Sequence, residues 1–101
     1  MNRRVRLSTK AQDDLDRLFD FLAEQDIAAA HRARAAIARA YGLIGELPLI
    51  GRKAGDGANP CLRELTVPFG NTGYVILYEL EDATTITIAS FRHQREDDYD
   101  R

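Results

Sequence analysis

Apolar residues recur at helical spacing through the first half of the chain. Within residues 9–24 they lie three or four positions apart, as on one face of an amphipathic helix, at Leu15, Leu18, Phe19 and Leu22. Thr9 and Gln12 have the spacing of a capping box at the start of this segment. Asp13 and Asp14 follow in the first turn, where the helix dipole favours negative charge. The pattern therefore predicts a helix over residues 9–24.

A second helix is predicted after Asp26, whose side chain can cap a first turn. Alanine has the strongest helix preference of all residues, and it dominates this segment at Ala28, Ala29, Ala30, Ala33, Ala35, Ala36, Ala38 and Ala40. Ile37, Tyr41 and Ile44 share one face and mark the buried side. Pro48 ends the helix. Because the join between the two helices is short, we expect an antiparallel helical hairpin.

The second half of the chain has strand patterns instead. Strands are predicted at residues 61–67, 73–80 and 84–91, which are rich in good strand formers. Short connections at 68–72 and 81–83 predict an antiparallel meander. Residues 3–7 are expected to add a short edge strand. Residues 48–60 contain several Gly and Pro residues and are expected to form the longest loop.

The predicted order of elements is βααβββ over one domain, residues 1–101. This order is typical of an α+β fold of two layers, in which an N-terminal helical hairpin packs on a small, mainly antiparallel sheet. On the strand at 73–80, Tyr74, Ile76 and Tyr78 are expected to lie under the helices. Val75 and Leu77 would then lie on the opposite, open face.

Composition removes several classes of function. The net charge is −2, without the basic excess of a non-specific nucleic-acid binder. The chain has no apolar run long enough to cross a bilayer and no signal core, so we expect a cytoplasmic protein that does not bind membranes. Cys61 is the single cysteine, interpreted as buried. With only His31 and His93 beside it, no metal site and no cofactor are expected.

Three segments resemble one protein family. Leu62-Arg63-Glu64-Leu65, the Gly-Tyr strand at 73–79, and Arg92-His93-Gln94-Arg95-Glu96 followed by Tyr99 are similar to the RelE/ParE superfamily of bacterial toxins. The resemblance implies the toxin half of a type II toxin–antitoxin module. The expected partner is a cognate antitoxin whose C-terminal segment wraps the toxin. Operator DNA would be bound only indirectly, through the antitoxin.

The superfamily has two branches with different targets. RelE-like toxins cut mRNA on the ribosome, whereas ParE-like toxins inhibit DNA gyrase. The mRNA-cutting branch often has an arginine directly after the Gly-Tyr pair, where this chain has Val75. His93 stands where the best-known RNA cutters tend to have an arginine. The comparison favours a ParE-like inhibitor of DNA gyrase, and a ribosome-dependent mRNA endonuclease is the alternative.

Metal-free RNA cleavage would need a base, an acid, cations and a stacking ring. If the chain is a nuclease, the candidates are Glu96 as base, His93 as acid, Arg92 as cation and Tyr99 as the stacking ring. Arg63 and Arg95 are candidate contacts to RNA or to another target. The other interpretation of this tail is a solvated run of charges that pair with one another, with Tyr99 packed on the sheet.

The antitoxin surface is expected where the fold leaves apolar residues uncovered. A sheet with one face under helices has a second face and an edge, which can accept a strand or an amphipathic helix. The candidates are Val75 and Leu77 on the open face of the sheet, and Leu43 and Leu47 at the end of the second helix.

Overall fold

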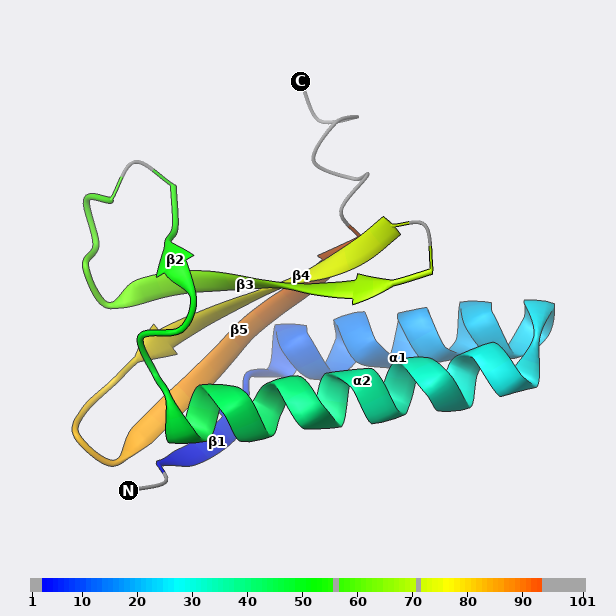
Figure 1. Ribbon diagram of the computed structural model, residues 1–101, viewed down its shortest axis with the longest axis horizontal. Coiled ribbons are helices and arrows are strands. Elements are labelled where there is room, and N and C mark those ends of the chain that lie inside the picture. The colour runs from blue at the N-terminus through cyan, green and yellow to red at the C-terminus, as the bar shows by residue number, and fades with distance from the viewer. Residues whose placement is uncertain (1–2, 56, 71, 94–101) are drawn as a thin grey trace.

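The computed structural model describes residues 3–55, 57–70 and 72–93. Its helices are α1 (Thr9–Gln25) and α2 (Ile27–Glu46). Its strands are β1 (Arg4–Leu7), β2 (Arg52–Lys53), β3 (Leu62–Phe69), β4 (Thr72–Leu80) and β5 (Thr85–His93). The helical hairpin covers one face of the sheet (Figure 1). The expected α+β fold of two layers is confirmed.

The N-cap predicted for the second helix is confirmed, and the one predicted for the first helix is wrong by one residue. Asp26 caps α2, accepting a hydrogen bond from the Ala28 N–H at 3.0 Å. The first helix is capped by Ser8 and not by Thr9, because Ser8 has extended backbone and its Oγ accepts from the Ala11 N–H at 3.0 Å. The same hydroxyl donates to the Ala89 carbonyl at 2.9 Å, which links the helix start to β5.

The sheet has the strand order β1-β5-β4-β3-β2. The three long strands pair as an antiparallel meander, and β1 adds to its edge parallel to β5. The other edge corrects the prediction that residues 48–60 are loop throughout. Arg52 and Lys53 form β2, paired with Glu64 and Arg63 of β3. This short pairing depends on a partner strand ten residues later in the chain, so local sequence does not reveal it.

The core lies between the helical hairpin and the sheet. Ile76 and Tyr78 of β4 are fully buried there, as the alternation predicted. Ile86 and Ile88 of β5 and Ile44 of α2 are equally inaccessible. Ile37 is also buried, which confirms the side of α2 that was expected to face the core. Within the described residues, neither helix is apolar enough over the required length to span a membrane.

Candidate functional site

Charged side chains cross the open face of the sheet. Glu64 of β3 accepts from the Arg52 Nε at 2.7 Å, and its second oxygen lies 3.6 Å from the Arg92 Nη2. The Glu64 side chain is only 13% exposed, so this carboxylate is enclosed between the two guanidinium groups. The centre of the open face therefore carries a carboxylate flanked by arginines from β2 and β5.

This ion pair changes the expectation for Val75. Arg92 is the register partner of Val75, and Glu64 is the register partner of Leu77. Because β3 and β5 lie on either side of β4, the Arg92–Glu64 ion pair passes over β4 on the open face. Val75 lies on that face as predicted, but it is 6% exposed and presents little surface of its own. Leu77 is half-buried.

Arg63 points to the segment between α2 and β2. Its Nη1 donates to the Gly51 carbonyl at 2.7 Å and lies 3.5 Å from the Leu49 carbonyl. The Tyr78 hydroxyl reaches the same segment, accepting from the Gly51 N–H at 2.9 Å and donating to the Pro48 carbonyl at 2.7 Å. We call these contacts of Tyr78 and Arg63 with Gly51 the Gly51 clamp.

The clamp also affects the ionisation of Tyr78. Burial raises the pKa of its phenol, while the hydrogen bond from the Gly51 N–H and the nearby Arg63 charge partly oppose that rise. The hydroxyl therefore keeps its proton and can donate it to the Pro48 carbonyl. Figure 1 shows where the clamped segment runs, from the end of α2 into β2 at the edge of the sheet.

Apolar side chains gather on the outside of this segment. We call Leu47, Pro48, Leu49 and Ile50 the apolar loop; they line a shallow hollow together with Glu46. Leu47 is 55% exposed, Leu49 65% and Ile50 40%. Leu43, one helical turn earlier, is also exposed. Sequence reasoning identified Leu43 and Leu47 but missed Leu49 and Ile50. The signal was present in the sequence: the predicted loop begins with three consecutive apolar residues at 48–50, directly after Leu47, and they have no apolar partner within the loop itself.

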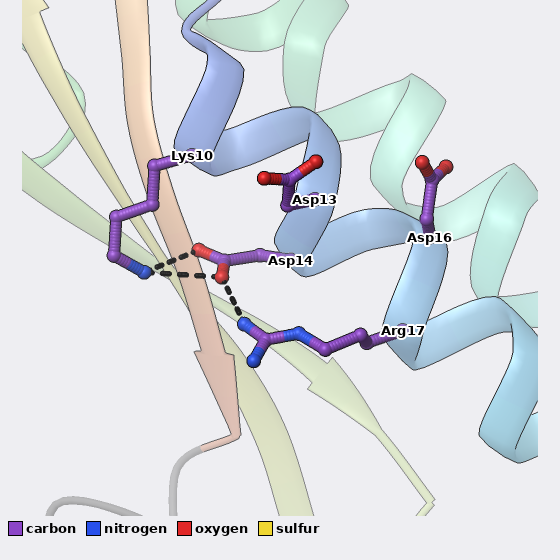
Figure 2. Close-up of a pocket in the computed structure, with 5 residues that line it drawn as sticks. All are labelled: Lys10, Asp13, Asp14, Asp16 and Arg17. Atoms are coloured by element: carbon purple, nitrogen blue, oxygen red, sulfur yellow. Dashed lines mark hydrogen bonds and ion pairs between the residues drawn. The ribbon is translucent and has the colours of Figure 1, made fainter.

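A second hollow lies at the start of α1 (Figure 2). Its lining residues are Lys10, Asp13, Asp14, Asp16 and Arg17. The Asp14 carboxylate accepts from the Lys10 Nζ at 3.0 and 2.9 Å, from the Arg17 Nη2 at 2.5 Å, and from the buried Phe91 N–H at 3.0 Å. In Figure 2 the Asp13 and Asp16 side chains point away from this group.

The surroundings of Asp14 assign it a structural role. Burial raises the pKa of its carboxyl, but the hydrogen bonds from Lys10, the Phe91 N–H and Arg17 outweigh burial, so that the pKa is lowered overall. The ionised carboxylate thus ties α1 to β5, one residue before Arg92. Sequence reasoning placed Asp14 at the helix N-terminus for its charge, but the first turn of α1 contains no acidic residue, and the long-range bond to the Phe91 N–H was not identified.

The chain matches known proteins both in sequence and in fold. A family model described as "ParE toxin of type II toxin-antitoxin system, parDE" matches residues 5–98. The chain belongs to the ParE toxin family. This ParE-family chain is 38% identical over 76 residues to "Toxin RelE1" of Caulobacter vibrioides, covering 75% of this chain and 77% of that protein.

A solved structure supports the same fold for this ParE-family chain. It is described as "Chromosomal ParDE TA system from P. aeruginosa", with a TM-score of 0.65 and 18% sequence identity. The alignment covers 90% of this chain and 95% of that one. At this level of identity, the likeness establishes the fold alone.

The residues predicted for nuclease chemistry are only partly within the described structure of this ParE-family toxin. Arg95, Glu96 and Tyr99 lie outside the described residues. His93 and Arg92 are neighbours on β5, so their side chains leave opposite faces of the strand. Arg92 lies on the open face with Glu64. The His93 ring lies on the helix side, edge-on to the Tyr74 ring, with 5.5 Å between the two ring centroids.

The remaining candidates are a metal site and the thiol of Cys61. Across residues 3–55, 57–70 and 72–93, no group of three or more His, Cys, Asp or Glu side chains is arranged to hold a metal ion. Cys61 was interpreted as buried, but it is exposed. It lies in the turn directly before β3, where its N–H donates to Asn59 Oδ1 at 3.0 Å.

Proposed function

We propose that this ParE-family chain inhibits growth by binding a target protein, with DNA gyrase as the target, and that a cognate antitoxin neutralises it. Family membership supports the toxin–antitoxin setting. The neighbouring structure is described as a ParDE system, which supports an antitoxin of the ParD kind as the partner. Operator DNA is then contacted through the antitoxin, and the place of action is the cytoplasm.

The choice of a protein target rests on what the arginine side chains contact. Cleavage of RNA without a metal needs cations directed at the phosphate that reacts. Arg52 and Arg92 are both directed at Glu64, and Arg63 donates to the Gly51 carbonyl. A phosphate on the open face would also meet the Glu64 carboxylate, and like charges repel. These contacts favour a surface that binds protein.

The antitoxin proposal rests on exposed apolar surface. Leu43 and Leu47 lie at the end of α2, next to Leu49 and Ile50. Exposed apolar patches of this kind mark interaction sites, because burying them against a partner releases ordered water. On the open face, Leu77 is half-buried. It can contact a partner only if that partner also packs against the Arg92–Glu64 ion pair.

The test is induction of the chain in a bacterial host, with and without the antitoxin encoded next to it. We expect growth arrest, induction of the DNA-damage response, and inhibition of supercoiling by purified gyrase, with cellular mRNA intact. The antitoxin should reverse all of these effects. Cleaved mRNA together with normal supercoiling would contradict the choice of target.

Ribosome-dependent mRNA cleavage is the second candidate. The relative named "Toxin RelE1" favours it, because RelE-like toxins are the mRNA-cutting branch. His93→Ala separates the candidates. It should abolish mRNA cleavage if His93 is the acid, and it should leave inhibition of gyrase in place if the chain acts by binding.

A further inference from the structure

We propose that the apolar loop is a contact surface formed before the partner arrives, and that the Gly51 clamp holds it in place. Its occupant is a segment of the antitoxin with apolar side chains flanked by carboxylates. This inference rests on the proposed function, since it assumes that the chain has an antitoxin. It adds which loop the antitoxin contacts, which residues hold that loop, and which chemistry the antitoxin segment carries.

Hydrogen bonds hold the apolar loop at both of its ends. One hydroxyl, that of Tyr78, is bonded to the Pro48 carbonyl and to the Gly51 N–H, so both ends of the turn are attached to the same buried atom. Arg63 holds the carbonyl of Gly51 from the other side. Only Leu49 and Ile50 lie between the two attached residues, and their side chains are directed outward, 65% and 40% exposed.

The second step is why this geometry needs glycine at position 51. A Cβ at Gly51 would lie 2.6 Å from the Glu64 carbonyl oxygen and 2.6 Å from the Tyr78 hydroxyl. Carbon atoms do not approach oxygen so closely, so any side chain would push the loop away from the sheet. The backbone of Gly51 is thus packed directly against β3 and β4, and the exposed turn has a rigid base.

The rigidity of the loop affects how tightly a partner can bind. A flexible loop loses conformational entropy when a partner orders it, which weakens binding. The turn from Pro48 to Gly51 is already ordered by hydrogen bonds to Tyr78, so its conformational entropy is lost when the chain folds and not when the partner binds. Leu49 and Ile50 are meanwhile not part of the core cluster, and both keep a large fraction of their surface in solvent. Their exposure is useful only if a partner covers them.

The fourth step is the charge of the occupant. Arg39 precedes the exposed apolar residues and Arg52 and Lys53 follow them, all on the surface. Glu46 is the exposed carboxylate beside them and Glu64 pairs with Arg52, so three cations face two carboxylates and the rim keeps a basic excess. A second copy of the chain docked on the same surface would bring two basic rims together. A segment whose apolar residues are flanked by Asp or Glu would meet opposite charge instead. The rim therefore selects an acidic partner segment over a second copy.

The experiment measures binding of the purified chain to the antitoxin encoded beside its gene, by surface-based kinetics. Leu49→Ser and Ile50→Ser should each weaken affinity by about 10-fold, as for side chains central to an interface. Ile27→Ser is the matched control, because Ile27 is 67% exposed at the far end of the helical hairpin. We expect it to bind like the parent chain.

The clamp is tested with Tyr78→Phe and Arg63→Ala. Both should remove hydrogen-exchange protection from the Gly51 amide and slow association with the antitoxin by about three- to tenfold, because a freed loop is only partly in the binding conformation. Tyr41→Phe is the control, since the Tyr41 hydroxyl is buried without a hydrogen-bond partner among the described residues. Arg63→Ala leaves the core unchanged and keeps the test valid if Tyr78→Phe fails to fold.

The outcomes are distinct. Normal affinity of both Leu49→Ser and Ile50→Ser would refute the contact surface while leaving the toxin–antitoxin function intact. Loss of Gly51 protection with unchanged association would refute the role of the clamp. Self-association of the parent chain that Leu49→Ser abolishes would show that the occupant is a second copy, against the inference. Failure of the parent chain to bind the antitoxin at all would refute the proposed function as well.

Discussion

Removing the Asp14 carboxylate is the most informative perturbation of the fold. Asp14→Ala deletes the acceptor of the Phe91 N–H and the ion pairs of Asp14 with Lys10 and Arg17. The side chain of Asp14 is only 3% exposed, so water does not readily replace those partners. The substitution therefore tests whether a buried ionised group holds α1 against β5.

The expected loss follows from the individual contacts. A buried N–H left without an acceptor costs about 1–3 kcal/mol. Lys10 and Arg17 are 68% and 75% exposed, so their ion pairs are strongly screened, and each adds only about 0.3–0.5 kcal/mol. Together the substitution should lower the free energy of unfolding by about 2–3 kcal/mol, or the melting temperature by about 10–20 °C for a domain of this size.

The assay is urea denaturation of Asp14→Ala and the parent chain at several pH values. The folded-state pKa of Asp14 lies below the ordinary value of 3.8, so the ionised group stabilises the fold above that value. The contribution is lost as the pH falls through the folded-state pKa. The difference between the two proteins should thus be constant near neutral pH and shrink in strong acid.

Asp16→Ala provides the matched control. Asp16 lies on the same helix and is exposed, with one hydrogen bond from the Gln12 Nε2 at 3.1 Å. Its removal should change stability by no more than about 0.5 kcal/mol. Equal stability of Asp14→Ala and the parent chain at neutral pH would refute the reasoning. So would a difference that stays constant through the acid range.

Three further substitutions test other contacts by denaturation. Tyr78→Phe should cost about 1–3 kcal/mol because it leaves the Gly51 N–H and the Pro48 carbonyl without a partner, whereas Tyr41→Phe should be nearly neutral; equal losses would contradict this. Gly51→Ala should cost about 1–3 kcal/mol from overpacking, and unchanged stability would contradict the close approach. Ser8→Ala should cost about 1 kcal/mol as a lost cap, while Thr9→Ala should not.

Local sequence was sufficient for most of the secondary structure. The Ala-rich segment forms α2 because alanine has the highest intrinsic helix preference, and Asp26 caps it through a bond to an amide two residues away. The stripe of Ile76 and Tyr78 is buried because strand side chains alternate between faces. These properties depend on neighbours in the chain. Ile76 and Tyr78 also belong to the Gly-Tyr strand that carried part of the resemblance to the toxin family.

The candidate site was predicted less completely. Leu43 and Leu47 were identified as exposed apolar residues, and both are exposed. Val75 was expected to be open, but the Arg92–Glu64 ion pair crosses β4 beside it. Sequence alternation assigns a residue to a face of the sheet. It does not reveal which long side chains from neighbouring strands will lie across that face.

The sequence by itself determined the order of the two helices and the four longer strands, the face of each that is apolar, and the family. Only the tertiary structure decided that β2 pairs with β3, that Asp14 bonds to the Phe91 N–H, and that Tyr78 holds Pro48 and Gly51. The physical reason is distance along the chain. Helix and strand preferences arise between residues a few positions apart, whereas each of these contacts joins residues 10 to 77 positions apart that only the folded chain brings together.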